Sequence, residues 1–238
     1  MVKKQAQVLS FFSGKGGVGK SSICTAIGMS LALHKKSVLW IDMDLGWRNL
    51  DFILKADRDI VFDLSHIFQG VCHWRESLIS PPAAPHCHLI AGTLTQIAPP
   101  AMRHILTDLI AQARGSYDYI LIDLGSGFDE IHEFVLNLCD LPVLISTTDL
   151  SSLRSVDKIL GIVPVDKKPL WILNQFPFAV DTLGEYAQEL NYPISAVIPL
   201  FPLKHSFWGS LFGHKEKALY EKVIPHLSQL ALKIPSER

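Results

Sequence analysis

The chain has 238 residues, of which 48% are hydrophobic and 19% charged, and its formal net charge at pH 7 is −1. This composition is typical of a globular protein and excludes a disordered chain, and the near-zero charge gives no signal for nucleic-acid binding. The length fits one large α/β domain, and no repeat or linker divides it. We therefore expect residues 1–238 to form a single domain.

Cysteine usage and the distribution of apolar residues bear on the compartment. The cysteines lie far apart, with no C-x-x-C pair, which favours a reduced, intracellular protein. The first apolar strand pattern follows Gln5 directly and leaves no room for a signal peptide, and no apolar run approaches the roughly 18 to 20 residues of a membrane span. We expect a cytoplasmic protein. The cysteines are Cys24, Cys72, Cys87 and Cys139.

The first elements in the chain are an apolar strand pattern over 7–12 and a helical pattern over 23–34, joined by a glycine-rich turn. Strand, turn and helix are the context that the motif G-x-x-x-x-G-K-[ST] requires to bind phosphate through backbone N–H groups and the helix N-terminus. Lys20 is placed to reach the outer phosphates and Ser21 to ligate Mg²⁺. The predicted nucleotide-binding residues here are Gly14, Lys15, Gly16, Gly17, Val18, Gly19, Lys20, Ser21 and Ser22.

A second lysine lies inside this turn. Lys15 directly follows the first glycine, where a phosphate-binding loop does not need a charge. It is too close to the turn to fold back easily onto its own phosphates, so it has two interpretations. Either it reaches a nucleotide held by a facing subunit, or it only adds positive potential to the loop.

The rest of the chain alternates between short apolar runs and helical patterns. This alternation predicts a three-layer α/β sandwich, with a mostly parallel twisted sheet and helices on both faces. The segment Ser80 to Pro85 is predicted to be a surface loop. The expected strands cover 37–42, 88–91, 117–123, 141–146, 169–173 and 194–198. The expected helices cover 101–114, 155–163, 182–190 and 218–231, the last interrupted by Pro225.

Carboxylates follow two of the expected strands. Asp42 and Asp44 end the strand over 37–42, and Asp123 ends the strand over 117–123 and precedes a glycine-rich turn. Ligands of parallel α/β sheets bind at the carboxyl ends of the strands, where such side chains hold Mg²⁺ through water and orient an attacking water. The alternative is that these residues only form turns.

Several of these motifs together resemble the MinD/ParA family of ATPases with a deviant Walker A loop, most closely its MinD and FlhG members. The resemblance covers most of the chain to about residue 199. It is carried by the loop Lys15 to Ser21, the segment Asp42 to Asp51 and the strand end Leu121 to Gly127. Residues 60–72 resemble the helix that follows the second of these segments, and residues 147–153 match a further family segment.

The resemblance implies a site that binds ATP and Mg²⁺, with Lys15, Lys20 and Asp44 as the catalytic set. Lys15 would cross a two-fold interface to the partner's ATP, and Asp44 would be the switch I carboxylate needed for hydrolysis. The implied metal residues are Ser21, Asp44 and Asp123. The implied switch residues are Asp42 and Gly127, and the implied adenine contacts are Asn174 and Pro199.

The chain departs from the family pattern at three places. Most relatives have a proline where Gly125 stands, so this turn is looser here. Past Pro199 the expected polar loop over the base is replaced by an apolar segment that includes Phe207 to Phe212, for which core packing, a partner site and a membrane contact are all open. The basic amphipathic C-terminal helix of MinD is not found, so attachment to a membrane by that route is not expected.

The predicted function is that of a Mg²⁺-dependent ATPase that forms an ATP-dependent homodimer and acts as a spatial or assembly switch with an unidentified protein partner or activator. The alternative is an ATP-binding scaffold with little hydrolysis. A metabolic enzyme built on the same loop is disfavoured, because such relatives need a cluster-binding cysteine arrangement or an added substrate domain. The histidines and cysteines between Cys72 and His88 match no zinc-binding spacing and are expected to be structural.

Overall fold

The structure is a computed structural model that describes residues 5–95, 99–164, 166–177, 188 and 190–200. Its centre is an eight-stranded sheet with the order β3-β4-β2-β5-β1-β6-β7-β8. All neighbouring strands are parallel except the pair β3 and β4. The strands are β1 (Gln7–Phe12), β2 (Val38–Met43), β3 (Leu78–Ile79), β4 (His88–Ile90), β5 (Tyr119–Leu124), β6 (Leu141–Ser146), β7 (Leu170–Phe176) and β8 (Ile194–Pro199).

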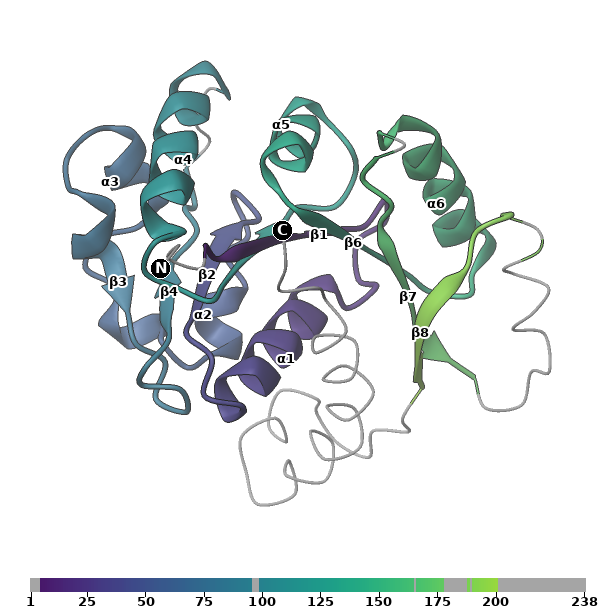
Figure 1. Ribbon diagram of the computed structural model, residues 1–238, viewed down its shortest axis with the longest axis horizontal. Coiled ribbons are helices and arrows are strands. Elements are labelled where there is room, and N and C mark those ends of the chain that lie inside the picture. The colour runs from purple at the N-terminus through teal and green to yellow at the C-terminus, as the bar shows by residue number, and fades with distance from the viewer. Residues whose placement is uncertain (1–4, 96–98, 165, 178–187, 189, 201–238) are drawn as a thin grey trace.

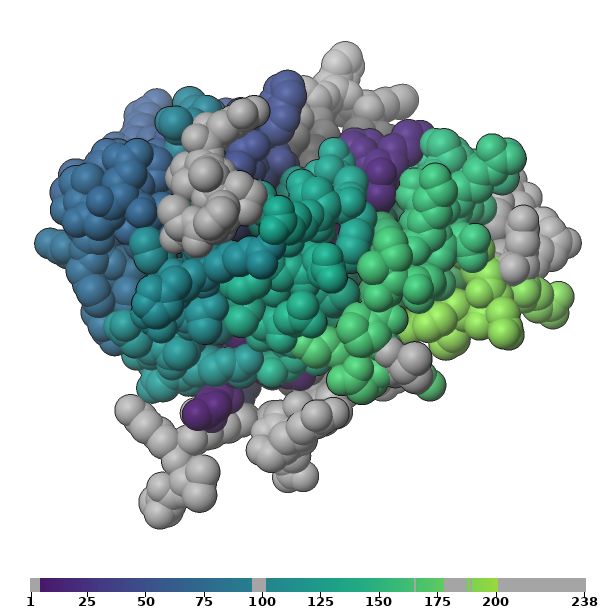
Figure 2. Space-filling view, turned by 90° about the horizontal axis from the view of Figure 1, so that it is seen from above, coloured from purple at the N-terminus to yellow at the C-terminus, as the bar shows by residue number. Residues whose placement is uncertain are grey.

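Helices cover both faces of this sheet. One face carries α1 and α2, and the opposite face carries α3, α4, α5 and α6 (Figure 1). Figure 2 looks onto the second face, where the blue, teal and green residues of these helices follow one another across the surface. The helices are α1 (Lys20–Leu33), α2 (Leu50–Ile53), α3 (Leu64–Phe68), α4 (Pro99–Ala113), α5 (Glu130–Leu138) and α6 (Leu150–Ile162), with 3₁₀ turns η1 (Asp57–Asp59) and η2 (Trp74–Ser77).

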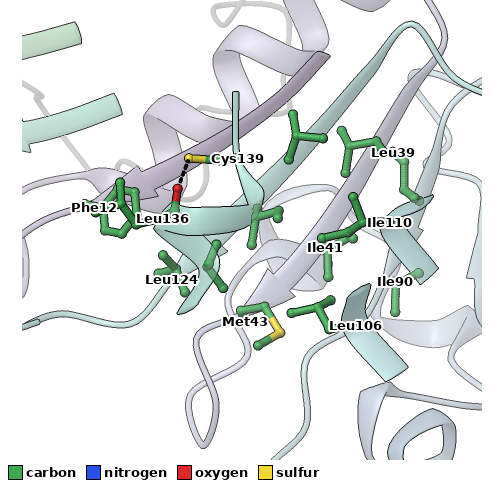
Figure 3. Close-up of a cluster of buried hydrophobic side chains, with 14 of the residues drawn as sticks. Phe12, Leu39, Ile41, Met43, Ile90, Leu106, Ile110, Leu124, Leu136 and Cys139 are labelled. Carbon is green, nitrogen blue, oxygen red and sulfur yellow. Dashed lines mark hydrogen bonds between the residues drawn. The ribbon is translucent and has the colours of Figure 1, made fainter. Parts of the chain in front are cut away.

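Two apolar layers, one on each side of the sheet, form the core. The central strands β2 and β5 are buried at every position, which explains why their sequences are apolar except for one aspartate at the next-to-last position of each. On the side of α4 and α5, residues such as Ile41 and Leu124 of the sheet pack with Leu106 and Leu136 of the helices (Figure 3). This packing fixes the carboxyl ends of β1, β2 and β5 along one edge.

The expected three-layer α/β fold is confirmed, and every strand expected from the sequence is present, with ends shifted by a few residues at most. Residues 80–85 form no helix or strand, as predicted. The structure adds β3, α2 and α5, and α6 begins at Leu150 rather than Ser155, because Asp149 caps its N-terminus. A two-residue strand such as β3 has no alternation that a sequence pattern could reveal.

Some expectations fall outside the described residues. They are the helix over 218–231, most of the helix over 182–190 and the apolar segment Phe207 to Phe212. None of the helices in the described part of the chain has the length and apolar character needed to cross a bilayer.

Candidate nucleotide-binding site

The predicted phosphate-binding loop lies between β1 and α1. Gly19 is the N-cap of α1 and has a φ of 89°, a left-handed conformation that favours glycine. A Cβ atom at Gly19 would lie 2.4 Å from the amide nitrogen of Asn174, so space also requires glycine here. That amide nitrogen donates a hydrogen bond of 2.7 Å to the Val18 carbonyl. Asn174, near the end of β7, therefore supports the loop through this bond.

Lys20 and Asp123 form a buried ion pair beneath this loop. The Lys20 ammonium and an Asp123 carboxylate oxygen are 2.7 Å apart, and the two side chains are 6% and 0% exposed. Burial alone would lower the pKa of Lys20, but the Asp123 and Asp44 carboxylates outweigh it and raise that pKa above its usual value. The second carboxylate oxygen of Asp123 is buried and has no hydrogen-bond partner among the residues that the structure describes. This oxygen is available to a ligand-bound water or a metal.

Asp42 is fully buried and organises the loop that follows β2. Its carboxylate accepts hydrogen bonds from the backbone N–H groups of Asp44 (3.1 Å), Asn49 (3.0 Å) and Leu50 (2.9 Å). Burial, followed by the nearby charge of Asp123, raises the pKa of Asp42 to about 7. Asp42 therefore holds the conformation of residues 44–50, which contain the predicted switch I carboxylate.

Asp44 projects from the loop after β2 toward the turn that follows β5. Its carboxylate accepts a hydrogen bond of 2.9 Å from the Asn49 side chain. A Cβ atom at Gly125 would lie 3.2 Å from the other Asp44 oxygen, so Asp44 lies against the turn after β5. Burial raises the pKa of Asp44, and the charge of Lys20 opposes that rise. The charges of Asp44, Lys20 and Asp123 thus lie close enough to influence one another.

Replacement of Asp42 by asparagine tests its role in shaping the loop. An amide cannot accept at both oxygen positions, so at least one buried N–H of residues 44, 49 and 50 loses its partner. The expected loss is about 1–3 kcal/mol in the free energy of unfolding. Urea denaturation measures it, with Asp57→Asn as a control because Asp57 is exposed. Unchanged stability of Asp42→Asn would contradict the proposed role.

The turn after β5 packs directly on the phosphate-binding loop. Gly127 has a φ of 105°, and its N–H donates a hydrogen bond of 2.8 Å to the Ser13 carbonyl. Ser13 immediately precedes the loop, so movement of Gly127 and movement of the loop are coupled. Gly127 is one of the two switch residues that the resemblance implied.

Lys15 lies at the exposed rim of the loop, with its side chain directed at α6. Its ammonium is 2.8 Å from a carboxylate oxygen of Asp149, and both side chains are nearly half exposed. Lys15, followed by the hydroxyls of Ser151 and Thr147, lowers the pKa of Asp149. An ion pair at this exposure contributes at most about 1 kcal/mol, so its rupture costs little. No motif links these two residues, which are 134 positions apart in the chain.

The remaining predicted residues are distributed around the same edge. Ser21 and Ser22 lie in the first turn of α1, and Pro199 ends β8 beside Phe176 of β7. No three histidine, cysteine, aspartate or glutamate side chains gather as a metal cage within the described residues. Mg²⁺ at nucleotide sites instead takes one or two carboxylates, waters and phosphate oxygens, so Asp44 and the second oxygen of Asp123, together with the Ser21 hydroxyl, fit it.

This arrangement, a glycine-rich loop between a central strand and a helix with lysine and strand-end aspartates beside it, defines a P-loop nucleotide-binding α/β protein. Residues 6–168 match the family model of the AAA domain. The chain belongs to the MinD/ParA family of ATPases.

Curated relatives and solved structures agree with this assignment. The septum site-determining protein MinD of Helicobacter pylori is 32% identical over 158 residues, which are 66% of this chain and 59% of that protein. The matched region thus spans about three-fifths of the length of such relatives. The MinD cell division protein of Aquifex aeolicus is 26% identical with a TM-score of 0.76, covering 97% of this chain and 99% of that one.

A more distant structure supports the fold alone. MinD of Pyrococcus horikoshii, solved with Mg-ADP, is 22% identical with a TM-score of 0.72, and the comparison covers 95% of this chain and 97% of that one.

Proposed function

We propose that this protein is a Mg²⁺-dependent ATPase that dimerises on ATP and separates after hydrolysis, and so acts as a switch in spatial positioning or assembly in the cytoplasm. The observation that carries the proposal is the meeting of Lys20, Asp44 and Asp123 at one edge of the sheet, under a glycine-rich loop. These groups supply charge neutralisation and a carboxylate beside the place where the γ-phosphate would lie.

Each residue has a distinct task in this proposal. Lys20 neutralises the outer phosphates, and Ser21 with Asp123 holds Mg²⁺ directly or through water. Asp44 orients a water for in-line attack on the γ-phosphorus, so that the bond to the β-phosphate oxygen breaks and ADP and phosphate are released. The Gly127 N–H donates a hydrogen bond to the Ser13 carbonyl, next to the phosphate-binding loop. Loss of the γ-phosphate would therefore change the position of Gly127 through this bond.

Lys15 supports the dimerisation step of the proposal. In the single subunit it is paired with Asp149, and both side chains are nearly half exposed at the rim of the site. A triphosphate in a second subunit carries more negative charge than one carboxylate and would compete for the Lys15 ammonium. The Lys15–Asp149 pair is weak enough to exchange. Several MinD relatives are septum site-determining proteins, and a partner protein that stimulates hydrolysis belongs to the same proposal.

Release of phosphate from ATP tests the proposal. Purified protein is assayed with Mg²⁺ and with EDTA, in parallel with calorimetric titration of ATP. Slow, Mg²⁺-dependent phosphate release at saturating ATP is expected. ATP binding with no release, even with cell extract added as a source of activator, would instead establish the ATP-binding scaffold, to which the looser turn at Gly125 would be suited.

A further inference from the structure

His132 of α5 contacts the turn that follows β5. This turn, residues 125–127, is called the switch II turn because it contains the predicted switch residue Gly127. The side chain is 6% exposed, and its ring packs beside Phe12 and Phe128, with centroids 6.2 and 5.9 Å away. Nδ1 lies 2.7 Å from an oxygen of Asp129, the N-cap of α5, and Nε2 lies 3.1 Å from the Gly125 carbonyl oxygen. One imidazole therefore joins the start of α5 to the turn between β5 and α5.

Helix capping does not account for the bond to Gly125. The chain contains a second capping box of the same composition at α3, where Asp63 caps the helix and His66 returns its Nδ1 at 2.9 Å. The His66 side chain is 39% exposed, and no hydrogen bond from its Nε2 is found within the described residues. Capping thus needs only one ring nitrogen, whereas His132 uses both.

The hydrogen on His132 Nε2 follows from its partner. A carbonyl oxygen only accepts, so Nε2 carries a hydrogen and donates it to Gly125. Nδ1 then either accepts from the Asp129 N–H, at 3.3 Å, or in the protonated ring donates to the Asp129 carboxylate. The bond to Gly125 persists in both protonation states.

Gly125 occupies a critical place in the turn. It follows Asp123 by two residues, its Cβ position is 3.2 Å from Asp44, and Gly127 is bonded to Ser13. Glycine leaves the backbone of this turn free to adopt many conformations, so an external bond is needed to hold it. The side chain of His132 supplies that bond from a helix that is itself packed on β1.

We propose that His132 is a positioning residue, which holds the switch II turn at Gly125 against Asp44 and the phosphate-binding loop and so sets the geometry for hydrolysis. This inference rests on the proposed ATPase function. His132 touches neither ATP nor the metal in this account and acts through the Gly125 carbonyl.

Two substitutions at His132 separate positioning from capping. Asparagine places its amide near Nδ1 and retains the capping group, but it cannot reach Gly125. Glutamine places a donor near Nε2 and retains the bond to Gly125, but it lacks the capping geometry. We expect His132→Asn to lower kcat by about threefold to tenfold with KM for ATP little changed, and His132→Gln to retain most of kcat.

His66→Asn is the matched control, because it makes the same change in the second capping box, at α3, and it should leave kcat unchanged. The opposite order at position 132, with asparagine active and glutamine impaired, would assign His132 to capping alone and overturn the proposal. Equal loss in both variants would also overturn it.

Amide hydrogen exchange of residues 124–128 in nucleotide-free protein supplies a readout that needs no hydrolysis. Faster exchange in His132→Asn than in His132→Gln is expected, and equal exchange would overturn the proposal that His132 holds the turn. If the parent releases no phosphate while exchange differs as expected, the proposed ATPase function is wrong, but His132 still holds the turn.

Discussion

Replacement of Lys20 by alanine is expected to remove ATP binding and to destabilise the folded protein at the same time. The lost charge-assisted contact to phosphate costs about 1.5–3 kcal/mol or more of binding free energy. The same change leaves the buried Asp123 carboxylate without its partner, and breaking a buried pair in this way costs about 3–5 kcal/mol of unfolding free energy. Calorimetry with ATP and urea denaturation measure the two effects.

A second variant separates binding from stability. In Lys20→Ala with Asp123→Asn, the unpaired buried charge is gone, so most of the stability should return while ATP binding does not. If Lys20→Ala bound ATP as tightly as the parent, the assignment of the phosphate-binding loop would be wrong. If Lys20→Ala were as stable as the parent, the buried Lys20–Asp123 pair would make no contribution to the free energy of unfolding.

Replacement of Asp44 by alanine is expected to lower the rate of hydrolysis by about 100-fold or more, because a positioned group that orients the attacking water contributes on the order of 10² to 10⁴ in rate. ATP binding should be nearly unchanged, since Lys20 and the backbone N–H groups hold the phosphates, and the variant should accumulate as the ATP-bound dimer. Single-turnover phosphate release measures the effect. Asp57→Asn, an exposed carboxylate change, is the control. Equal rates for Asp44→Ala and the parent would move the catalytic role to another residue.

The phosphate-binding loop could be predicted because its chemistry is local. Nine consecutive residues carry both the backbone that binds phosphate and the two side chains that complete it, and their flanking strand and helix are visible as periodic patterns. The strand-end aspartates were predictable for a related reason, because parallel strands bring their carboxyl ends to one edge. These predictions required no knowledge of how the loops lie.

The contacts that depend on loop conformation could not be predicted. The three N–H groups that surround Asp42 belong to residues after the strand, and their convergence follows from the turn that Gly46 and Arg48 make with positive φ. The pairing of Lys15 with Asp149 joins loops from β1 and β6, which become neighbours only in the folded sheet.

The start of helix α5 is marked in the sequence by a capping pattern. Asp129 is a favourable N-cap residue, and Ile131, Val135 and Leu138 follow at helical spacing. The same Asp-x-x-His pattern occurs at Asp63, so the pattern predicts a helix start in both places. The bond to Gly125 needed the structure, because it depends on the path of the turn between β5 and α5.

In the proposed function, ATP joins two subunits through Lys15. Light scattering of the parent and of Lys15→Ala, each with Mg²⁺ and ATP, ADP or no nucleotide, tests it most directly. A non-hydrolysing background such as Asp44→Ala preserves the ATP state during the measurement. We expect the parent to double its mass with ATP only, and the Lys15→Ala variant to bind ATP by calorimetry but to remain monomeric. A parent that is monomeric with ATP and Mg²⁺ at every concentration, or a Lys15→Ala variant that dimerises as the parent does, would contradict it.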